Sequence, residues 1–424
     1  NPNPYMRRNE GASVNLNPLG QGGNYIPYGL LCDMGFSLDA GQNATFSNIE
    51  VRNKRMPQSL LRGNDFAMSA GLTPSNGAYK LSGGSEGFFV TADPSRNAMP
   101  MLRTGFNLEG KQVVNARLYV TSRGIYEFYI NGHRVGNDYY NPGLTQYNKT
   151  HYYQTYNVTS LLTSGKNAMG AMMGEGWWSG LLSFGSIWNH FGDRQSLLAK
   201  LVISFSDGST KVVVTNDKDW KYYNQSPIIY SSLDMGEVYD ATREAAVNGW
   251  STSVFDDSEW QKAVTVPIDG SAFYGTIEEM GHKSELNYDH MQLVGQIGNN
   301  AGIYEILTAK SMKEVRPGVY VYDMGQNFVG VPRIVIHNGQ TGRKITLRYA
   351  EILYPNLPES KGNVGMLMLE NYRAALCQDI YTEKEGEQTI QPHFTFRGYQ
   401  YIEITGIDKP LPLEDVKGVA ISSV

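Results

Sequence analysis

Residues suited to binding a sugar are concentrated in one short stretch of the sequence. Trp177 and Trp178 form an aromatic pair, Glu175 precedes them, and Trp188 and Asn189 follow. Sugars present apolar C–H faces and hydroxyl rims, so binding sites combine an aromatic platform with a few directed polar groups. In an extended strand the two adjacent rings would point to opposite faces, so at most one of them would lie in the core. Core packing is the alternative for each ring, and simple solvation is the alternative for Glu175.

A second group of residues carries oxygen atoms suited to calcium. Asn137 and Asp138 are followed by Asn141 on a stretch rich in Gly and Pro. Calcium prefers clusters of carboxylate, amide and backbone oxygens. The same residue types also form Asx turns, so a turn is the alternative to a metal site. Zinc sites built from Cys/His pairs are excluded, because the sequence contains neither CxxC nor HExxH.

Glu237 and Asp240 are the best local pair of carboxyl groups. Inverting glycoside hydrolysis needs two carboxyls about 6.5–9.5 Å apart. In an extended segment these two would point to opposite faces, and an ion pair with Arg243 is favoured over catalysis. The histidines are scattered along the chain, and their spacing assembles no Ser/His/Asp or Cys/His constellation. We therefore predict no catalytic residue in this chain.

The elements that must position these residues are predicted to be strands. The chain contains 46 Gly and 28 Tyr, and only 18% of its residues are charged. Aromatic side chains favour half-buried pleated strands, and Gly supplies turn positions with positive φ. Residues 125–130 are strand-like and are followed by Asn131-Gly132, the signal of a two-residue hairpin. Residues 168–173 are apolar throughout and predict a strand buried on both faces.

Length and charge limit the class of protein. A chain of 424 residues is long enough for two to four domains. Its net charge of −5 argues against a nucleic-acid or anionic-membrane partner. No apolar run is long enough to span a membrane. Two buried free thiols are favoured over a disulfide between Cys32 and Cys377. The predicted fold class is all-β, with consecutive β-sandwich or jelly-roll domains.

Three blocks of sequence together resemble one family. The first comprises residues 116–132, Asn141-Pro-Gly-Leu-Thr145 and Gly176-Trp-Trp-Ser-Gly180; the second is Gly236-Glu-Val-Tyr-Asp-Ala-Thr-Arg243; the third comprises Tyr322-Asp-Met-Gly-Gln-Asn327, Tyr349-Ala-Glu351 and Arg397-Gly-Tyr-Gln-Tyr401. In this order and spacing the blocks resemble the β-domains of bacterial α-L-rhamnosidases of glycoside hydrolase family 78.

The resemblance implies three domains. Residues 1–92 would be a partial N-terminal concanavalin-like β-sandwich with a linker. Residues 93–270 would be a jelly roll similar to carbohydrate-binding module family 67, and residues 271–424 a concanavalin-like β-sandwich. Some family-67 modules bind L-rhamnose through calcium. The resemblance therefore implies that calcium would be held near Asp138 and that a rhamnose-containing glycan is the partner.

The family's catalytic unit is an (α/α)6 barrel that follows these blocks, and its acid-rich motifs have no match here. We therefore expect the accessory portion of an inverting α-L-rhamnosidase, which binds L-rhamnose and has the C-terminal catalytic domain of the same protein as its partner. The family also implies a secreted or periplasmic protein. The alternative is a purely structural scaffold for the barrel that binds no sugar.

Overall fold

The computed structural model describes residues 99–180, 190–192, 194–268, 271–279, 282–360, 362–372, 375 and 377–423, together with eight short strands between residues 33 and 90. The described chain is all-β, which confirms the predicted fold class. It divides into two compact units, Asn1–Asn97 and Ala98–Val424. No helix in the described residues is long and apolar enough to cross a membrane.

The first unit contains three small antiparallel sheets. One pairs β8 with β1 and β5, one pairs β7 with β2 and β6, and one pairs β3 with β4. The strands are β1 (Asp33–Phe36), β2 (Asn43–Ser47), β3 (Glu50–Arg52), β4 (Leu60–Arg62), β5 (Ala67–Met68), β6 (Thr73–Ser75), β7 (Ala78–Ser82) and β8 (Gly87–Val90).

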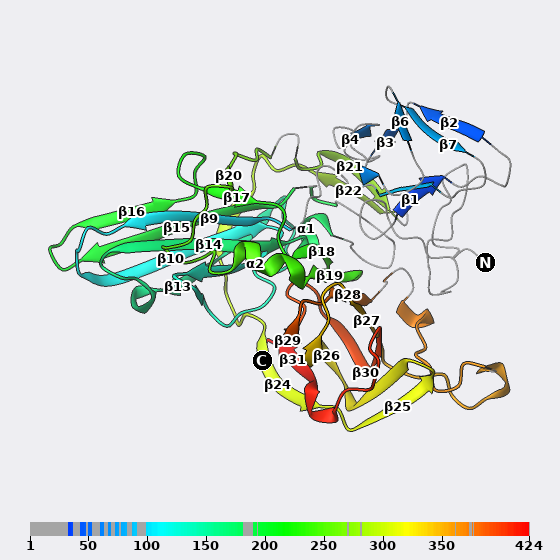
Figure 1. The fold of residues 1–424 in the computed structure, drawn as a ribbon. Coiled ribbons are helices and arrows are strands. Elements are labelled where there is room, and N and C mark those ends of the chain that lie inside the picture. The colour runs from blue at the N-terminus through cyan, green and yellow to red at the C-terminus, as the bar shows by residue number, and fades with distance from the viewer. Residues whose placement is uncertain are drawn as a thin grey trace. The chain divides into compact units, whose positions relative to one another are not determined.

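The second unit begins with a sandwich of two sheets (Figure 1). The five-stranded sheet has the order β16 (Thr210–Val214), β15 (Ser196–Phe205), β10 (Val113–Arg123), β13 (Thr150–Asn157), β23 (Gln292–Gly295). The six-stranded sheet has the order β12 (His133–Arg134), β11 (Ile125–Ile130), β14 (Lys166–Gly174), β9 (Met101–Asn107), β17 (Lys221–Tyr223), β20 (Gln261–Lys262). Side chains from both sheets, such as Leu118 and Phe128, share one buried core.

Local sequence explains two features of this sandwich. Asn131 and Gly132 have φ of 49° and 86°, and they join β11 to β12 as the Asn-Gly signal predicts. The strand β14 lies between β11 and β9 in the middle of its sheet and is buried along nearly its whole length. The prediction of a strand buried on both faces over residues 168–173 is confirmed.

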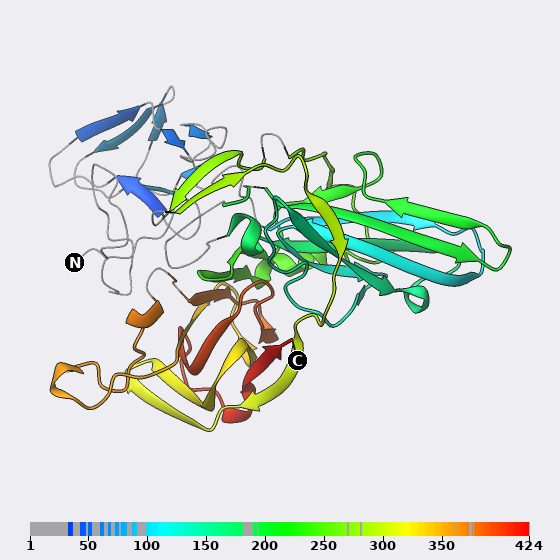
Figure 2. The ribbon, with the colours of Figure 1, turned by 180° about the vertical axis from the view of Figure 1, so that it is seen from behind.

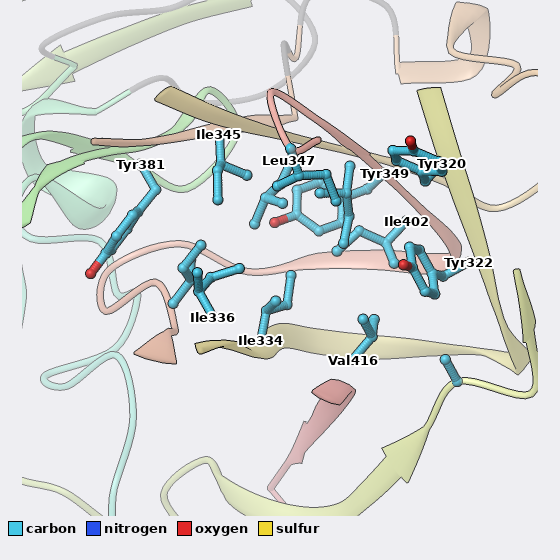
Figure 3. Packing of buried hydrophobic residues seen from close by; sticks show 14 of the residues in the cluster. Tyr320, Tyr322, Ile334, Ile336, Ile345, Leu347, Tyr349, Tyr381, Ile402 and Val416 are labelled. Atoms are coloured by element: carbon cyan, nitrogen blue, oxygen red, sulfur yellow. The ribbon is translucent and has the colours of Figure 1, made fainter. Parts of the chain in front are cut away.

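A ten-stranded sheet forms the second half of the unit (Figure 2). Its main path is β18 (Ile228–Ser232), β19 (Gly236–Asp240), β28 (Gln378–Thr382), β27 (Lys344–Ala350), β30 (Arg397–Thr405), β26 (Val319–Gly339), β31 (Val416–Ser422), β24 (Gly302–Thr308), with β25 (Ser311–Arg316) and β29 (Gly386–Ile390) both paired to β26. The sheet encloses an apolar core that includes Tyr349 and Ile402 (Figure 3). A separate hairpin consists of β21 (Gly275–Glu279) and β22 (His282–Leu286).

Each half of this unit contributes a strand that pairs with a sheet of the other half. The hairpin of β18 and β19 lies within residues 93–270, yet β19 pairs in parallel with β28 of the ten-stranded sheet. The strand β23 lies within residues 271–424, yet it pairs in parallel with β13 of the first sandwich. Each half therefore completes a sheet of the other. The domain limits implied by the family resemblance stay a prediction.

Helical structure is limited to single turns in the described residues. The α-helical turns are α1 (Gly176–Ser179) and α2 (Glu244–Val247), and the 3-10 turns are Thr159–Leu161, Ala241–Arg243, Pro358–Ser360, Glu370–Tyr372 and Leu413–Asp415. Asp323 and Gly325 lie within β26, where the pairing register shifts between Asp323 and Phe328. Gly325 has a φ of 84° at this irregularity.

Candidate functional site

The predicted aromatic pair lies on a helical turn and not on a strand. Trp177 and Trp178 belong to α1, so the expectation of an extended segment was wrong. Trp178 is fully buried, where its ring packs against Tyr147 and stacks on Phe191. Trp177 is half-buried and contacts Phe396. The burial of Trp178 favours the core-packing alternative, and a sugar-binding role for either ring stays a prediction.

The other predicted sugar-binding residues have different outcomes. Glu175 is 1% exposed, so it is not simply solvated, and its carboxylate accepts a hydrogen bond from the Tyr230 hydroxyl at 3.4 Å. Trp188 and Asn189 lie outside the described residues. The structure therefore brings Glu175 beside the Trp pair as a buried group.

The predicted calcium ligands surround one carboxylate. Oδ2 of Asp138 accepts hydrogen bonds from the Tyr156 hydroxyl at 2.7 Å, the Asn300 amide at 2.7 Å and the Asn141 amide at 3.3 Å. Asn141 is buried and also donates to the Tyr156 hydroxyl at 2.9 Å, whereas Asn137 is exposed. The arrangement links Asp138 to Asn300, 162 positions further along the chain.

This donor set does not fit calcium well. Calcium prefers several oxygen ligands with more than one carboxylate in most sites. Here a single carboxylate oxygen is already occupied by N–H and O–H donors. The described residues also contain no group of three or more His, Cys, Asp or Glu side chains arranged to hold a metal. The geometry therefore favours a hydrogen-bonded hub at Asp138.

A cavity lies in the first sandwich, and we call it the jelly-roll cavity. Its volume is about 420 Å³, and both sheets contribute to its walls. About half of the wall residues are apolar, including Leu102, Leu197 and Trp220. Leu198 and Val264 line it as well and are 53% and 72% exposed, so the cavity opens to solvent. A cavity of this size with apolar walls and a few polar groups is typical of small-molecule sites.

Arg123 and His151 are the basic groups that line the jelly-roll cavity in the described residues. The His151 ring nitrogen Nε2 lies 2.8 Å from the carbonyl oxygen of Ser122. Burial lowers the pKa of His151 to about 4, so its ring is neutral near pH 7. Arg123 closes β10 and donates to the carbonyl of Val266 at 3.2 Å. The guanidinium is therefore the cationic group of this cavity.

A cluster of ionisable residues joins the two halves of the second unit, and we call it the seam cluster. Nδ1 of His393 lies 3.3 Å from Oε2 of Glu127, which belongs to β11 of the first sandwich. The same carboxylate accepts from the Tyr129 hydroxyl at 2.7 Å and lies 3.7 Å from Arg134. Glu237 of β19 accepts from the backbone N–H groups of His393 at 2.9 Å and of the next residue at 3.1 Å.

The environment of the seam cluster shifts the pKa values of Glu127, His393 and Glu237. Burial alone would raise the pKa of Glu127, but His393 and Arg134 outweigh burial and hold that pKa at about 2. Burial alone would lower the pKa of His393, but attraction to Glu127 raises it to about 9. Burial raises the pKa of Glu237 to about 7, despite its backbone donors. His393 and Glu127 therefore form an ion pair at neutral pH, with Glu237 partly protonated beside it.

A buried ion pair lies next to the seam cluster. Arg397 and Asp379 are joined at 2.5 Å, and both side chains are 4% exposed. Asp379 also accepts from the Tyr349 hydroxyl and from the backbone N–H of Glu237 at 2.8 Å. The Arg397 guanidinium lies 4.5 Å from the centre of the Tyr349 ring. This pair links β30 to β28, which both neighbour β27 in the ten-stranded sheet.

Sequence reasoning on the carboxyl pair was correct for one partner only. Arg243 pairs with Asp240 at 3.4 Å, whereas Glu237 is buried in the seam cluster. Reasoning from sequence also missed the seam cluster, because 266 positions separate Glu127 from His393. No local pattern marks such a contact.

Cys377 is a free buried thiol, as predicted, and Cys32 lies outside the described residues.

Comparison with known proteins confirms the resemblance of both halves. Residues 111–279 match the α-L-rhamnosidase N-terminal domain, and residues 313–422 match the bacterial α-L-rhamnosidase concanavalin-like domain. The order of the two domains is the order in which the sandwiches occur here. Fold and comparison define the β-domain portion of a glycoside hydrolase. More specifically, the chain belongs to the α-L-rhamnosidase family.

Individual relatives agree with this assignment. An α-L-rhamnosidase of Streptomyces avermitilis is 35% identical over 383 residues, which are 90% of this chain and 34% of the relative. One from Alteromonas sp. (strain LOR) is 37% identical over 73% of this chain and 30% of the relative. The crystal structure of the Streptomyces avermitilis α-L-rhamnosidase complexed with L-rhamnose superposes with a TM-score of 0.66 at 33% identity, covering 83% of this chain and 31% of that one. The chain thus spans about a third of the length of the curated relatives.

Proposed function

We propose that this chain is the accessory β-domain portion of an inverting α-L-rhamnosidase and that it binds L-rhamnose-containing glycans. The observation that carries the proposal is the match of both halves, in order, to the two rhamnosidase β-domains. The relative from Streptomyces avermitilis was crystallised with L-rhamnose, which supports L-rhamnose as the sugar. A low content of charged residues and an open apolar cavity suit a neutral sugar with a methyl group.

A secreted or periplasmic location belongs to this proposal and rests on the family resemblance alone. Calcium stays an expectation from the same resemblance. The hydrogen bonds to Asp138 favour rhamnose binding without calcium at that position. The catalytic barrel expected from the family would be the partner within the same protein.

A scaffold without sugar binding is the second candidate function. The seam between the two halves supports this candidate, because it buries apolar residues from both. Ile125 and Tyr140 of the first sandwich pack there with Val331, Val419 and Ile421 of the ten-stranded sheet. Full burial of such side chains contributes roughly 1.5–3 kcal/mol each. Two halves joined by a shared apolar core and by shared strand pairing are suited to supporting a further domain.

Two measurements separate these functions. Incubating the 424-residue chain with an aryl α-L-rhamnoside should give no turnover, and clear turnover would contradict an accessory role. Calorimetric titration with L-rhamnose, in calcium and again in chelator, should show binding in both conditions. Absence of binding in both would leave the scaffold function. Binding that requires calcium would restore a metal-dependent site.

A further inference from the structure

Arg123 is a half-buried arginine with no carboxylate partner among the described residues. Arg103, Arg348 and Arg397 each form an ion pair with an acidic residue. In the described residues, Arg123 instead donates to two neutral acceptors, the Val266 carbonyl at 3.2 Å and the Ser271 hydroxyl at 3.5 Å. Burial lowers its pKa, which shows that its charge is poorly compensated by the surroundings.

Arg123 lies in the wall of the jelly-roll cavity. The residue ends β10 and lines the cavity, while its guanidinium lies 5.6 Å from the centre of the buried Trp178 ring. Among the other described lining residues, His151 is neutral near pH 7 and Asp217 is an exposed carboxylate. About half of the described lining residues are apolar, and none of the polar ones brings a second permanent positive charge. The cavity thus combines one cation with surfaces that suit the C–H faces of a sugar ring.

We infer that the jelly-roll cavity binds a uronate, a sugar that carries a carboxylate. A guanidinium binds a carboxylate through two parallel N–H···O bonds, and this pairing is stronger inside a cavity than in water. The apolar walls contact the ring, and the carboxylate neutralises Arg123. This inference rests on the proposed carbohydrate-binding function, and it assigns an acidic sugar next to rhamnose in the glycan.

The test compares an acidic sugar with its neutral counterpart. NMR or calorimetric titration of the 424-residue chain with D-galacturonate should show binding, and D-galactose should bind more weakly by roughly tenfold or more. Arg123→Gln should reduce galacturonate binding to the level of galactose. Arg117→Gln is the matched control, because Arg117 lies on the same strand, is exposed and loses the same charge.

A second pair of variants tests the same inference if Arg123→Gln does not fold. Val264 is 72% exposed at the cavity, so Val264→Glu should weaken galacturonate binding by repulsion while Val264→Gln should not. Equal binding of the two sugars, or galacturonate binding unaffected by Arg123→Gln and Val264→Glu, would overturn the inference. If the chain binds L-rhamnose but not galacturonate, this inference is overturned and the proposed rhamnose binding stands. Loss of both sugars would remove the proposed sugar binding as well.

Discussion

The imidazole of His393 and the carboxylate of Glu127 meet at 3.3 Å, although one residue precedes β30 and the other lies on β11 of the opposite sandwich. This contact joins the two halves of the second unit by charge, while the apolar seam joins them by burial. The pKa values of Glu127 and His393 are shifted by this contact, so both depend on the packing of the two halves against each other.

The His393–Glu127 pair is expected to stabilise the protein in a defined pH window. The folded pKa of His393 is about 9, above the unfolded value of about 6.5. Its contribution is therefore fully present below pH 6.5 and lost as pH rises through 9. The folded pKa of Glu127 is about 2, so its contribution is lost as pH falls through 2. A double-mutant cycle of Glu127→Gln and His393→Gln by chemical denaturation should show positive coupling at pH 6 that vanishes at pH 10.

Glu237 should make the stability of the protein decrease as pH rises, over a lower pH range than His393 does. Its folded pKa of about 7 exceeds the unfolded value, so the folded state favours the protonated form. The associated stability is present below about pH 4.5 and is lost as pH rises through 7. Glu237→Gln keeps an oxygen for the backbone donors and should flatten the melting temperature between pH 5 and 8. An unchanged pH profile in this variant would show that Glu237 does not titrate as described.

Breaking the Arg397–Asp379 pair should be strongly destabilising. Removal of one partner leaves the other charge buried without compensation, which costs about 3–5 kcal/mol. Asp379→Asn should therefore lower the free energy of unfolding by that order. Lys111→Met removes an ion pair of exposed partners and should cost less than about 1 kcal/mol. Denaturant titrations of the two variants provide the comparison, and similar losses would contradict the assigned burial.

The two tryptophans of α1 should behave differently on truncation. Trp178→Ala removes a fully buried ring and should cost about 3–5 kcal/mol of stability. Trp177→Ala should cost less, because this ring is only half-buried. If Trp177 forms the sugar platform, the same variant loses L-rhamnose binding in calorimetry while it stays folded. Undiminished binding would remove Trp177 from the site.

Asp138 should act as a hub and not as a metal ligand. Asp138→Ala leaves the donors of Tyr156 and Asn300 without their shared acceptor, which should cost about 1–3 kcal/mol. Calcium should leave the melting temperature of the parent chain unchanged, because the carboxylate is already occupied. A rise in melting temperature with calcium that disappears in Asp138→Ala would support the metal site instead.

Much of the fold follows from local sequence. Asn131 and Gly132 specify a hairpin because both adopt positive φ at low cost. The uninterrupted apolar residues of β14 predict a strand in the middle of a sheet, and that is where it lies. Local pattern was insufficient for Trp177 and Trp178, because α1 is a single helical turn that tertiary packing holds in place.

The sequence by itself determined the all-β class, the principal hairpins and the family, because turn chemistry, residue periodicity and motif order are local or linear properties. Only the tertiary structure decided which charges meet. Glu127 contacts His393, and Arg123 lines the jelly-roll cavity, because folding brings together residues that lie far apart along the chain. The environment of each ionisable group, and with it the pKa and the ligand preference, depends on burial and on partners that no local pattern encodes.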